Sequence, residues 1–491
     1  MLRKTRIVLA AIFFICITLL FLDFTGTLHT WLGWMAKIQF LPAVLAVNTL
    51  VVAVLLLVTI LFGRIYCSVI CPLGVMQDII SWINGRLKKK NRFRFRYHKE
   101  RKWLRYGFLA AFIMALALGA HSAAILIAPY SAYGRIASNL LAPLYQWGNN
   151  FFAWIAERAD SYAFYSTDVW IRSLPTFIVA AATFIVLFIF AWKGGRSYCN
   201  NVCPVGTILG FFSRRSIFVP VIDTDKCRGC GLCGKQCKSS CIDMDNHVID
   251  YSRCVACMDC LESCREGAIS YTNRYARKAG NAAGLEKTDS GRRAFFLSAL
   301  MVGTAVTTEA KKGRIVPLAG MDRKEDRTTP VVPAGSSSLK NFTDHCTACQ
   351  LCVSSCPNNV LRPSSSPENF MQPEMHFDKG YCRPECNNCS QVCPAGAIRP
   401  IDAEEKSSVQ IGHAVIRLEL CVVNTDEVKC GNCARHCPVG AIRLVKKNPD
   451  DKDSRLIPCV NEERCIGCGA CEHLCPSEAI HIEGHLVHKH I

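Results

Sequence analysis

Apolar residues are concentrated in the first two hundred positions of this 491-residue chain, where long apolar runs alternate with polar and basic loops. Four runs are long enough to cross a hydrocarbon core about 30 Å thick as helices. They cover residues 7–22, 41–62, 104–128 and 174–192. The pattern predicts an α-helical membrane bundle of four spans, with the first run a retained helix rather than a cleaved signal peptide.

Basic residues are distributed unevenly between the loops. The segment 63–102 holds eleven Lys and Arg, whereas 23–40 holds one and 129–173 holds three. Because basic loops stay on the cytoplasmic side of bacterial membranes, this loop and both ends of the four-span unit are expected there. The formal net charge of +18 is offset by negatively charged metal clusters, so neither charge nor loop argues for a nucleic-acid partner.

An internal repeat lies at the two cytoplasmic exits of the bundle. Residues 63–74 and 195–206 share the pattern G-R-x-Y-C-x3-C-P-x-G, which indicates two related helical hairpins. Cysteines at i and i+4 share one helix face, so each motif is expected to present two thiols at the same depth. Together they would hold one cluster, form switchable thiol pairs, or merely pack. The cysteines are Cys67, Cys71, Cys199 and Cys203.

Cysteine is over-represented, with 31 residues, of which 24 form six groups of four. The groups between Cys227 and Cys264 follow C-x2-C-x2-C-x3-C. In bacterial ferredoxins this run gives three thiolates to one 4Fe-4S cluster and the fourth to a neighbouring cluster. Such close cysteines are poorly placed for disulfides, and zinc needs only C-x2-C pairs. The spacing therefore predicts iron–sulfur clusters.

The crossed rule assigns two clusters to the first two groups. The expected ligand sets are Cys227, Cys230, Cys233 and Cys264, and Cys254, Cys257, Cys260 and Cys237. Lys238 and Arg265 stand where a proline usually follows the fourth cysteine, which leaves the ligand count unchanged.

Four further groups follow, and they raise the expected total to six 4Fe-4S clusters. The expected ligand sets are Cys346, Cys349, Cys352 and Cys393; Cys382, Cys386, Cys389 and Cys356; Cys421, Cys430, Cys433 and Cys475; and Cys465, Cys468, Cys471 and Cys437. Several groups continue into Ala-Ile, which predicts a repeated unit of cluster loop, short helix and strand.

Three cysteines stand outside these sets. Cys459 is an alternative to Cys421, whose eight-residue gap to Cys430 is unusual, and the roles of Cys16 and Cys241 stay open. The histidines of the C-terminal tail are expected to be solvated polar residues rather than a metal site.

A twin arginine at Arg292 and Arg293 precedes an apolar run of about 14 residues, which is short for a span and resembles an export signal inside the chain. We expect a fifth span here. The expected domains are a membrane domain (1–215), a cytoplasmic double-cluster ferredoxin (216–280), an apolar segment with a linker (281–338) and a four-cluster domain outside the membrane (339–491). The fold class is therefore an α-helical membrane bundle with α+β bacterial-type ferredoxin modules.

A membrane unit joined to clusters suggests electron exchange with a lipid-soluble carrier, most simply a quinol. Polar and aromatic residues near the outer interface are candidates for its site, although interfacial aromatics are often plain anchors. They are His29, Trp31, Trp34, His121, Tyr130, Tyr133 and Arg135.

Residues 1–275, with the paired motifs, the segment P-Y-S-A-Y-G-R and the ferredoxin pair, resemble the NapH family of membrane quinol dehydrogenases. Residues 288–480 resemble NapG, the exported ferredoxin-type partner of that system. The membrane module is also similar to NosR and CcoG. The resemblance implies a bacterial inner-membrane protein that takes electrons from the quinone pool to a periplasmic reductase or cytochrome.

Two other functions remain open at this point. One is a redox factor in assembly or maturation, of the CcoG type, which would need few clusters. The other is a ferredoxin-linked quinone oxidoreductase, in which a cytoplasmic ferredoxin exchanges electrons with the inner cluster pair. The terminal acceptor, the quinone type and the direction of flow are not encoded in these motifs.

Overall fold

The computed structural model describes residues 1–23, 26–87, 95–161, 164–275, 327–448, 450 and 454–490. Met1–Thr272 and Arg327–Ile491 together form one compact unit, and Asn273–Asp326 form a second. The expected fifth span and twin-arginine segment lie outside the described residues.

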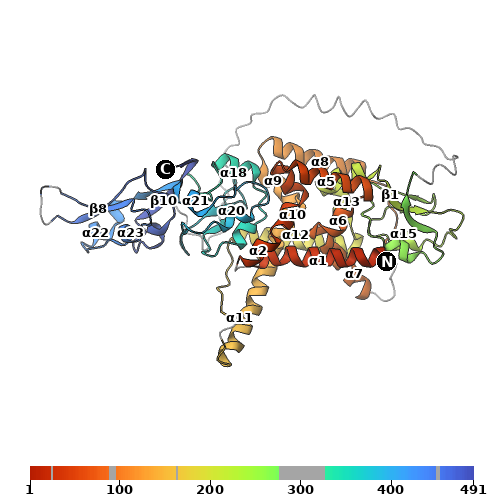
Figure 1. Cartoon of the computed structure of the whole chain (residues 1–491), viewed down its shortest axis with the longest axis horizontal. Coiled ribbons are helices and arrows are strands. Elements are labelled where there is room, and N and C mark those ends of the chain that lie inside the picture. The colour runs from red at the N-terminus through yellow and green to blue at the C-terminus, as the bar shows by residue number, and fades with distance from the viewer. Residues whose placement is uncertain are drawn as a thin grey trace. The chain divides into compact units, whose positions relative to one another are not determined.

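Helices of varied length follow one another through the first 213 residues (Figure 1). They are α1 (Leu2–Leu22), α2 (Thr27–Leu32), α3 (Trp34–Lys37), α4 (Phe40–Leu45), α5 (Thr49–Phe62), α6 (Ile65–Val69), α7 (Pro72–Leu87), α8 (Lys102–Ala117), α9 (His121–Ile127), α10 (Pro129–Ile136), the π-helix η1 (Ala137–Leu141), α11 (Ala142–Arg158), α12 (Leu174–Gly194), α13 (Ser197–Asn201) and α14 (Pro204–Ser213).

Two helices of the described residues, α1 and α12, are long and apolar enough to cross a membrane, each with 21 residues. The expected span at 41–62 is instead divided into α4 and α5, and the one at 104–128 into α8 and α9. The expectation of four continuous spanning helices is therefore wrong for these two.

Local backbone chemistry explains the two breaks. Val47 adopts a left-handed conformation (φ 53°), and the Asn48 side chain caps α5 by accepting a hydrogen bond from Val51 N at 3.2 Å. Gly119 (φ 72°) ends α8 in the same left-handed region, which glycine occupies without strain. Hydropathy alone does not register either event.

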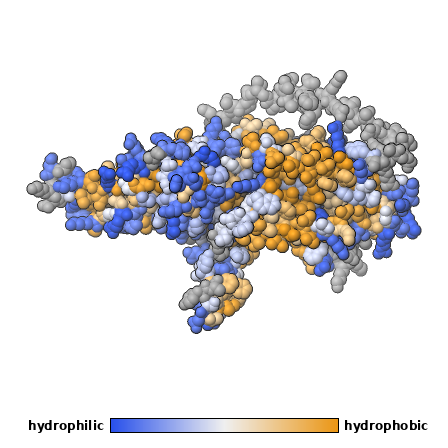
Figure 2. Space-filling model, in the orientation of Figure 1, coloured by the Kyte–Doolittle hydropathy of each residue, from blue (hydrophilic) through white to orange (hydrophobic). Residues whose placement is uncertain are grey.

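The surface of the helical part is strongly apolar. Figure 2 shows hydrophobic residues gathered over these helices and hydrophilic residues over the cluster-bearing parts on the face in view. Val8, Ile12, Leu57 and Ile185 are among its exposed large apolar side chains. Such a contiguous surface is unfavourable in water and suits a lipid environment.

The first ferredoxin module follows α14 and is built from small paired elements. Its sheets join β1 (Phe218–Ile222) to β4 (Ile269–Asn273) and β2 (Ile242–Asp243) to β3 (Val248–Ile249). Its helices are α15 (Leu232–Gln236) and α16 (Asp259–Ser263). We call this part, residues 216–275, the inner cluster domain.

The C-terminal part, residues 327–490, repeats this architecture and is called the outer cluster domain. Its antiparallel sheets join β5 (Leu361–Pro363) to β6 (Pro373–Met375), β8 (Ile442–Lys446) to β9 (Leu456–Val460), and β7 (Val409–Ile416) to β10 (Ile480–His490). Its helices are α18 (Leu339–His345), α19 (Leu351–Ser354), α20 (Asn388–Val392), α21 (Ala403–Ser408), the 3-10 helix η3 (Leu418–Leu420), α22 (Val422–Thr425), α23 (Asn432–Arg435) and α24 (Ala470–His473).

The expected strand after Ala-Ile is present in three of four cases. The strands β4, β8 and β10 begin at Ile269, Ile442 and Ile480, whereas no strand begins at Ile398. The prediction that a strand follows the cluster loop and short helix is therefore correct for three of the four cysteine groups that continue into Ala-Ile.

Candidate iron–sulfur centres and the arginine-linked cysteine quartet

The inner cluster domain brings the two crossed cysteine sets together. Cys227, Cys230, Cys233 and Cys264 line one cavity of about 160 Å³. A second cavity is lined by Cys237, Cys254, Cys257 and Cys260. Cys241 also lines it, with its Sγ 3.5 Å from that of Cys237, so this extra thiol packs beside a set that already has four members.

In the outer cluster domain, two more sets each surround a cavity. Cys356 joins Cys382, Cys386 and Cys389 around one. Around the other, the four cysteines are Cys437, Cys465, Cys468 and Cys471. In both sets the fourth cysteine comes from a different group, as in the crossed arrangement.

The remaining two sets are recognised by their electrostatics. Burial and the neighbouring Cys393 both raise the pKa of Cys346, Cys349 and Cys352, so Cys393 lies beside this trio. Burial, then Cys430, Cys475 and Cys421, raise the pKa of Cys433 to about 11. Cys421, Cys430 and Cys475 therefore all lie near Cys433. Cys459 is exposed on β9.

The donor sets fit a cluster better than a single metal ion. In the described part of the chain, no three Cys, His, Asp or Glu side chains converge tightly enough to hold one ion. A tetrahedral zinc site would require such convergence, since Zn–S bonds are about 2.3 Å long. Cysteines arranged around a cavity suit the larger 4Fe-4S unit, which when bound takes up and releases single electrons.

Lys406 is a buried cation beside one of these sets that sequence reasoning missed. Its Nζ donates a hydrogen bond to Cys382 Sγ at 3.2 Å and others to the carbonyls of Arg383 and Cys386. Hydrogen bonds to ligand sulfur are one means by which proteins tune cluster potentials. No local motif marks this lysine, because it reaches the cysteines from α21.

The four cysteines of the paired motifs converge in the helical part, and we call them the cysteine quartet. Each is at most 6% exposed. Burial, then Cys199, Cys71 and Cys67, raise the pKa of Cys203, and burial, then Cys67 and Cys199, raise that of Cys71, so the four thiols lie near one another. The expectation of one continuous helix face is wrong, because α6 ends before Cys71 and Cys203 caps the separate helix α14.

Two buried arginines, one from each motif, join the halves of the quartet reciprocally. Arg64 Nη2 lies 3.8 Å from Cys67 Sγ and donates to the carbonyl of Cys199 at 3.2 Å. Arg196 Nη1 lies 3.8 Å from Cys199 Sγ and donates to the carbonyl of Cys67 at 2.7 Å. Each arginine therefore contacts the sulfur of its own motif and the backbone of the other. The shared G-R-x-Y-C pattern was the signal for this pair.

The final glycine of each motif makes room for these arginines. A Cβ at Gly74 would lie 2.3 Å from the Cys67 carbonyl oxygen and 2.4 Å from Arg196 Nη1. A Cβ at Gly206 would lie 2.3 Å from the Cys199 carbonyl oxygen and 2.7 Å from Arg64 Nη2. Close backbone approach therefore explains why both motifs end in glycine.

The quartet is tied directly to the inner cluster domain. Arg64 Nη1 donates to the Ser252 carbonyl at 3.1 Å, and Asn200 Nδ2 donates to the Ser239 carbonyl at 3.1 Å. Ser252 precedes Cys254 by two positions and Ser239 follows Cys237 by two, so both contacts reach loops of the second cysteine set.

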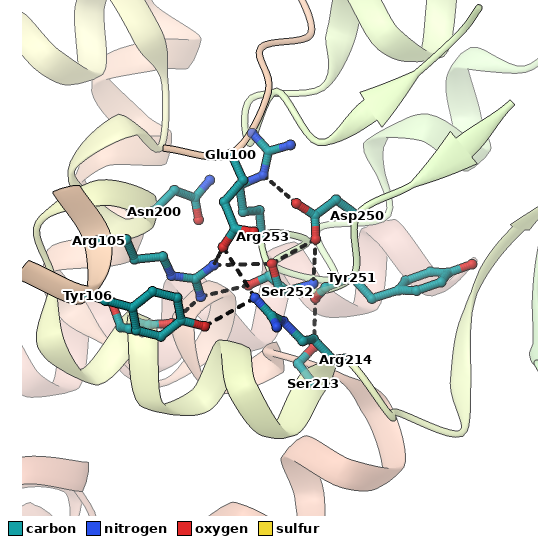
Figure 3. Close-up of polar contacts among 12 residues, drawn as sticks. Glu100, Arg105, Tyr106, Asn200, Ser213, Arg214, Asp250, Tyr251, Ser252 and Arg253 are labelled. Atoms are coloured by element: carbon teal, nitrogen blue, oxygen red, sulfur yellow. Dashed lines mark hydrogen bonds and ion pairs between the residues drawn. The ribbon is translucent and has the colours of Figure 1, made fainter. Parts of the chain in front are cut away.

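Arg105 of α8 strengthens the same junction (Figure 3). It donates to Ser252 Oγ and to the Ser252 carbonyl, both at 3.1 Å, and its Nη1 lies 2.8 Å from Glu100 Oε1. Asp250 accepts hydrogen bonds from Ser252 and Arg253, which fixes the turn before Cys254. These contacts hold the cluster loop firmly against the helices.

A buried ion cluster centred on Asp78 explains the lysine that replaces the usual proline. Lys238 Nζ lies 3.2 Å from Asp78 and 2.9 Å from Asp259. Arg196 and Arg6 also pair with Asp78, at 2.7 and 3.1 Å. Burial alone would raise the pKa of Asp78, but these cations hold it well below its usual range.

The opposite ends of the helices contact the outer cluster domain. Asn139 Nδ2 donates to Gln350 Oε1 at 2.8 Å, and Arg172 Nη1 donates to the Val353 carbonyl at 2.8 Å. Both partners lie in or beside the loop between Cys349 and Cys356. The helical part therefore contacts a cysteine set at each end.

The residues proposed for quinol binding separate into three environments. Tyr130, Tyr133 and Arg135 are buried in α10, which packs against α7, α9 and α12, and His29 is partly buried. Trp31 and Trp34 are exposed. His121 lines a cavity and pairs with Asp344 of α18.

The fold and the cysteine sets together define an iron–sulfur protein of the ferredoxin type. A family described as a 4Fe-4S binding domain matches residues 45–90 and 175–221, and each match contains one copy of the repeated G-R-x-Y-C-x3-C-P-x-G motif. Residues 345–422 and 428–479 match a family described as a 4Fe-4S dicluster domain. The chain thus carries iron–sulfur domains in both its helical and its C-terminal parts.

Similarity to curated proteins agrees with this class. The methylamine utilization ferredoxin-type protein MauM of Methylobacillus flagellatus is 30% identical over 158 residues, covering 31% of this chain and 67% of that protein. The ferredoxin-type proteins NapG and NapF of Escherichia coli are 26% and 28% identical over 39% and 32% of this chain, and 84% and 86% of their own lengths. The chain belongs to this family of ferredoxin-type proteins, and the expected resemblance to NapG is confirmed.

Proposed function

We propose that this protein carries electrons across a bacterial inner membrane, from quinol to a periplasmic reductase or cytochrome. Quinol oxidation releases two protons and two electrons, and the electrons would leave one at a time through the cysteine-held centres. The NapH-like first half and the NapG-like second half would then be a natural fusion of the two parts of such a system.

One observation carries the proposal: both long apolar helices connect the two cluster domains. At its N-terminal end α1 places Arg3 in an ion pair with Asp259 of the inner domain at 2.8 Å, and at its other end it contacts α19. Beyond the C-terminal end of α12, Arg196 N donates to the Lys238 carbonyl at 2.9 Å, while Arg172 precedes the other end and binds Val353.

The length of these helices matches a bilayer. A helix of 21 residues is about 31 Å long at a rise of 1.5 Å per residue, close to the hydrocarbon thickness. The two cluster domains would therefore lie on opposite sides, the inner one in the cytoplasm and the outer one in the periplasm. The pairs α4–α5 and α8–α9 would complete a four-span unit as broken helices.

The expected ligand sets would hold six 4Fe-4S clusters, and we assign a seventh to the cysteine quartet. Four buried sulfurs with two arginines beside them suit an anionic cluster. Thiol exchange would need access for a partner thiol, which the burial of all four cysteines denies. The quartet would relay electrons between the inner and outer domains.

A second candidate is reverse flow, in which a cytoplasmic ferredoxin donates electrons at the inner domain. The exposed Cys230 favours it, because it brings the first cysteine set to the surface where a soluble partner can dock. An assembly factor of the CcoG type is less favoured, since electron transport over distance is the simplest use of so many sets.

A reporter enzyme that is active only outside the cytoplasm, fused after Ile491, tests the arrangement. Activity is expected, with an equivalent fusion at Thr272 inactive. An inactive C-terminal fusion would put both cluster domains on the cytoplasmic side and remove the trans-membrane route. Quinol-dependent bleaching of cluster absorption in the purified full chain then tests the reaction.

A further inference from the structure

We infer that the buried hydroxyl of Tyr130 donates a hydrogen bond to a sulfur atom of the outer cluster whose expected ligands are Cys346, Cys349, Cys352 and Cys393. Such a bond would raise the reduction potential of this cluster and favour it as the acceptor of electrons that leave the helical part. The inference rests on the proposed iron–sulfur function and names a residue that tunes it.

The Tyr130 hydroxyl is buried without a partner. Tyr130 is 2% exposed, and its hydroxyl makes no hydrogen bond to any described residue. Its ring packs against that of Phe21 at a centroid distance of 5.9 Å, which helps to fix the side chain in place. A buried phenol without a hydrogen bond costs free energy, and buried polar groups in folded proteins nearly always have a partner. The hydroxyl therefore needs an acceptor that the described protein groups do not supply.

Two cysteines of the outer set lie near this hydroxyl. Among ionisable groups, those that act on Tyr130 are Cys349, Tyr133 and Cys393, in that order. Gly134 follows Tyr130 by four residues and therefore shares its helix face. A Cβ built on Gly134 would lie 2.2 Å from the carbonyl oxygen of Cys349. The face of α10 that carries Tyr130 thus lies directly against the loop of the outer set.

The same face continues along this loop beyond α10. Ser138, four residues after Gly134, places its Oγ 3.0 Å from Ser354 Oγ. Ser138 belongs to the π-helix η1, and π-helical turns are frequent at functional sites. Contacts at successive turns hold the helix against the cysteine loop, so the position of the Tyr130 hydroxyl relative to the outer set is well defined.

Cluster sulfur is the acceptor that suits this position. The thiolates and inorganic sulfides of a 4Fe-4S cluster accept hydrogen bonds, and such bonds are one of the determinants of its potential. A donor stabilises the more negative, reduced state more than the oxidised state, so the potential rises. The Tyr130 hydroxyl, expected from the sequence to be a candidate for quinol binding, would then be occupied by the cluster instead.

The position of α10 gives this tuning a purpose. The Tyr198 hydroxyl donates to the Ile127 carbonyl at 2.8 Å, and Tyr198 directly precedes Cys199 of the quartet. Arg135 of α10 interacts electrostatically with both Tyr198 and Cys349. The helix therefore lies between the quartet and this outer set. The tuned cluster would be the first in the outer domain to receive electrons from the quartet.

Tyr130→Phe tests the hydrogen bond in the cluster-loaded full chain by redox titration followed by electron paramagnetic resonance. The signal to follow is the one that Cys349→Ser removes. Tyr130→Phe should shift its midpoint to lower potential with iron content unchanged. Tyr133→Phe is the matched control and should cause no shift, because the Tyr133 hydroxyl is already hydrogen-bonded to Thr18.

A second variant carries 3-fluorotyrosine at position 130. It keeps the hydroxyl and makes it more acidic, hence a stronger donor, so the midpoint should move to higher potential. This variant decides the question if Tyr130→Phe loses iron.

The outcomes separate this inference from the proposed function. If Cys349→Ser lowers iron but neither variant of Tyr130 shifts the signal, the hydroxyl binds water or another group, and the inference fails while the proposed function stands. Equal shifts in Tyr130→Phe and Tyr133→Phe would also overturn it, since they would indicate a general effect of α10. If Cys349→Ser leaves iron unchanged, the outer set holds no cluster, and the proposed ligand set fails together with the inference.

Discussion

Arg196 reaches across the helical part to the other motif, where its Nη1 donates a 2.7 Å hydrogen bond to the backbone carbonyl of Cys67. The two residues are 129 positions apart, and the reverse contact, from Arg64 to Cys199, completes the exchange. The backbone beside the cysteines of each motif is thus held by the arginine of the other motif. Separate cysteine pairs become one four-sulfur site.

Replacing one cysteine from each motif tests whether the quartet holds a cluster. Cys67→Ser combined with Cys199→Ser should lower iron by about four atoms per chain, because a 4Fe-4S cluster carries four irons. Iron and acid-labile sulfide analysis of the purified protein measures this. Cys459→Ser is the control and should leave both unchanged, since Cys459 is exposed and lies outside the quartet. Equal iron in the two variants would contradict the assignment.

Gly206→Ala should disrupt the quartet without removing any ligand. The new Cβ would lie 2.3 Å from the Cys199 carbonyl oxygen, so the backbone that carries the cysteine must move. We expect loss of the quartet's iron and a destabilisation of about 1–3 kcal/mol, typical of overpacking. Thermal unfolding and iron analysis check this.

Gly148→Ala is the matched control for that variant. Gly148 lies inside α11 with no atom within 4 Å of the new Cβ, so the change should be neutral or stabilise by up to about 1 kcal/mol. Similar losses in both variants would argue against a steric role for Gly206.

Lys406→Met should lower the midpoint potential of one outer cluster. The lysine donates to Cys382 Sγ, and its charge and hydrogen bond favour the more negative, reduced state. Redox titration followed by electron paramagnetic resonance should show one signal shifted to lower potential. Lys340→Met removes an exposed lysine and should shift none. A signal unchanged in both would exclude this tuning role.

Asp78→Asn should be strongly destabilising. It leaves Arg6, Arg196 and Lys238 buried without their shared counter-charge, and removing one partner from such a site costs about 3–5 kcal/mol. The yield of folded, membrane-inserted protein and its thermal midpoint should both fall. Asp225→Asn, at an exposed site, should change neither.

Acidification should weaken the outer domain through His488. Burial, followed by the nearby His485 and His490, lowers the pKa of His488 to about 4. His488 binds a proton near pH 6.5 in the unfolded chain but near pH 4 in the folded chain. The free energy of unfolding is therefore at its full value above pH 6.5 and falls as the pH drops towards 4.

Protonation of His488 would lower the free energy of unfolding by about 3 kcal/mol at most. Thermal unfolding between pH 7.5 and 5 should show a smaller acid-induced decrease for His488→Leu than for the unaltered protein. His98→Leu, on an exposed loop, should behave like the unaltered protein. The expected solvation of the whole histidine tail is therefore wrong at His488, which is 7% exposed.

The cysteine sets were predicted from the sequence, because ligand spacing is a local property that three or four residues encode. The crossed partners Cys264 and Cys393, both expected from that spacing, lie beside the sets they were assigned to. The apolar runs also located α1 and α12 closely, since a spanning helix is a continuous stretch.

The tertiary structure alone decided the rest. Hydropathy averages across Val47 and Gly119, so it could not reveal the two helix breaks. Lys406 and Lys238 gain their roles from carboxylates or sulfurs that other segments bring within about 3 Å. The contact between the two cysteine motifs likewise depends on how the helical hairpins pack. Such contacts are set by long-range packing, and no local pattern records them.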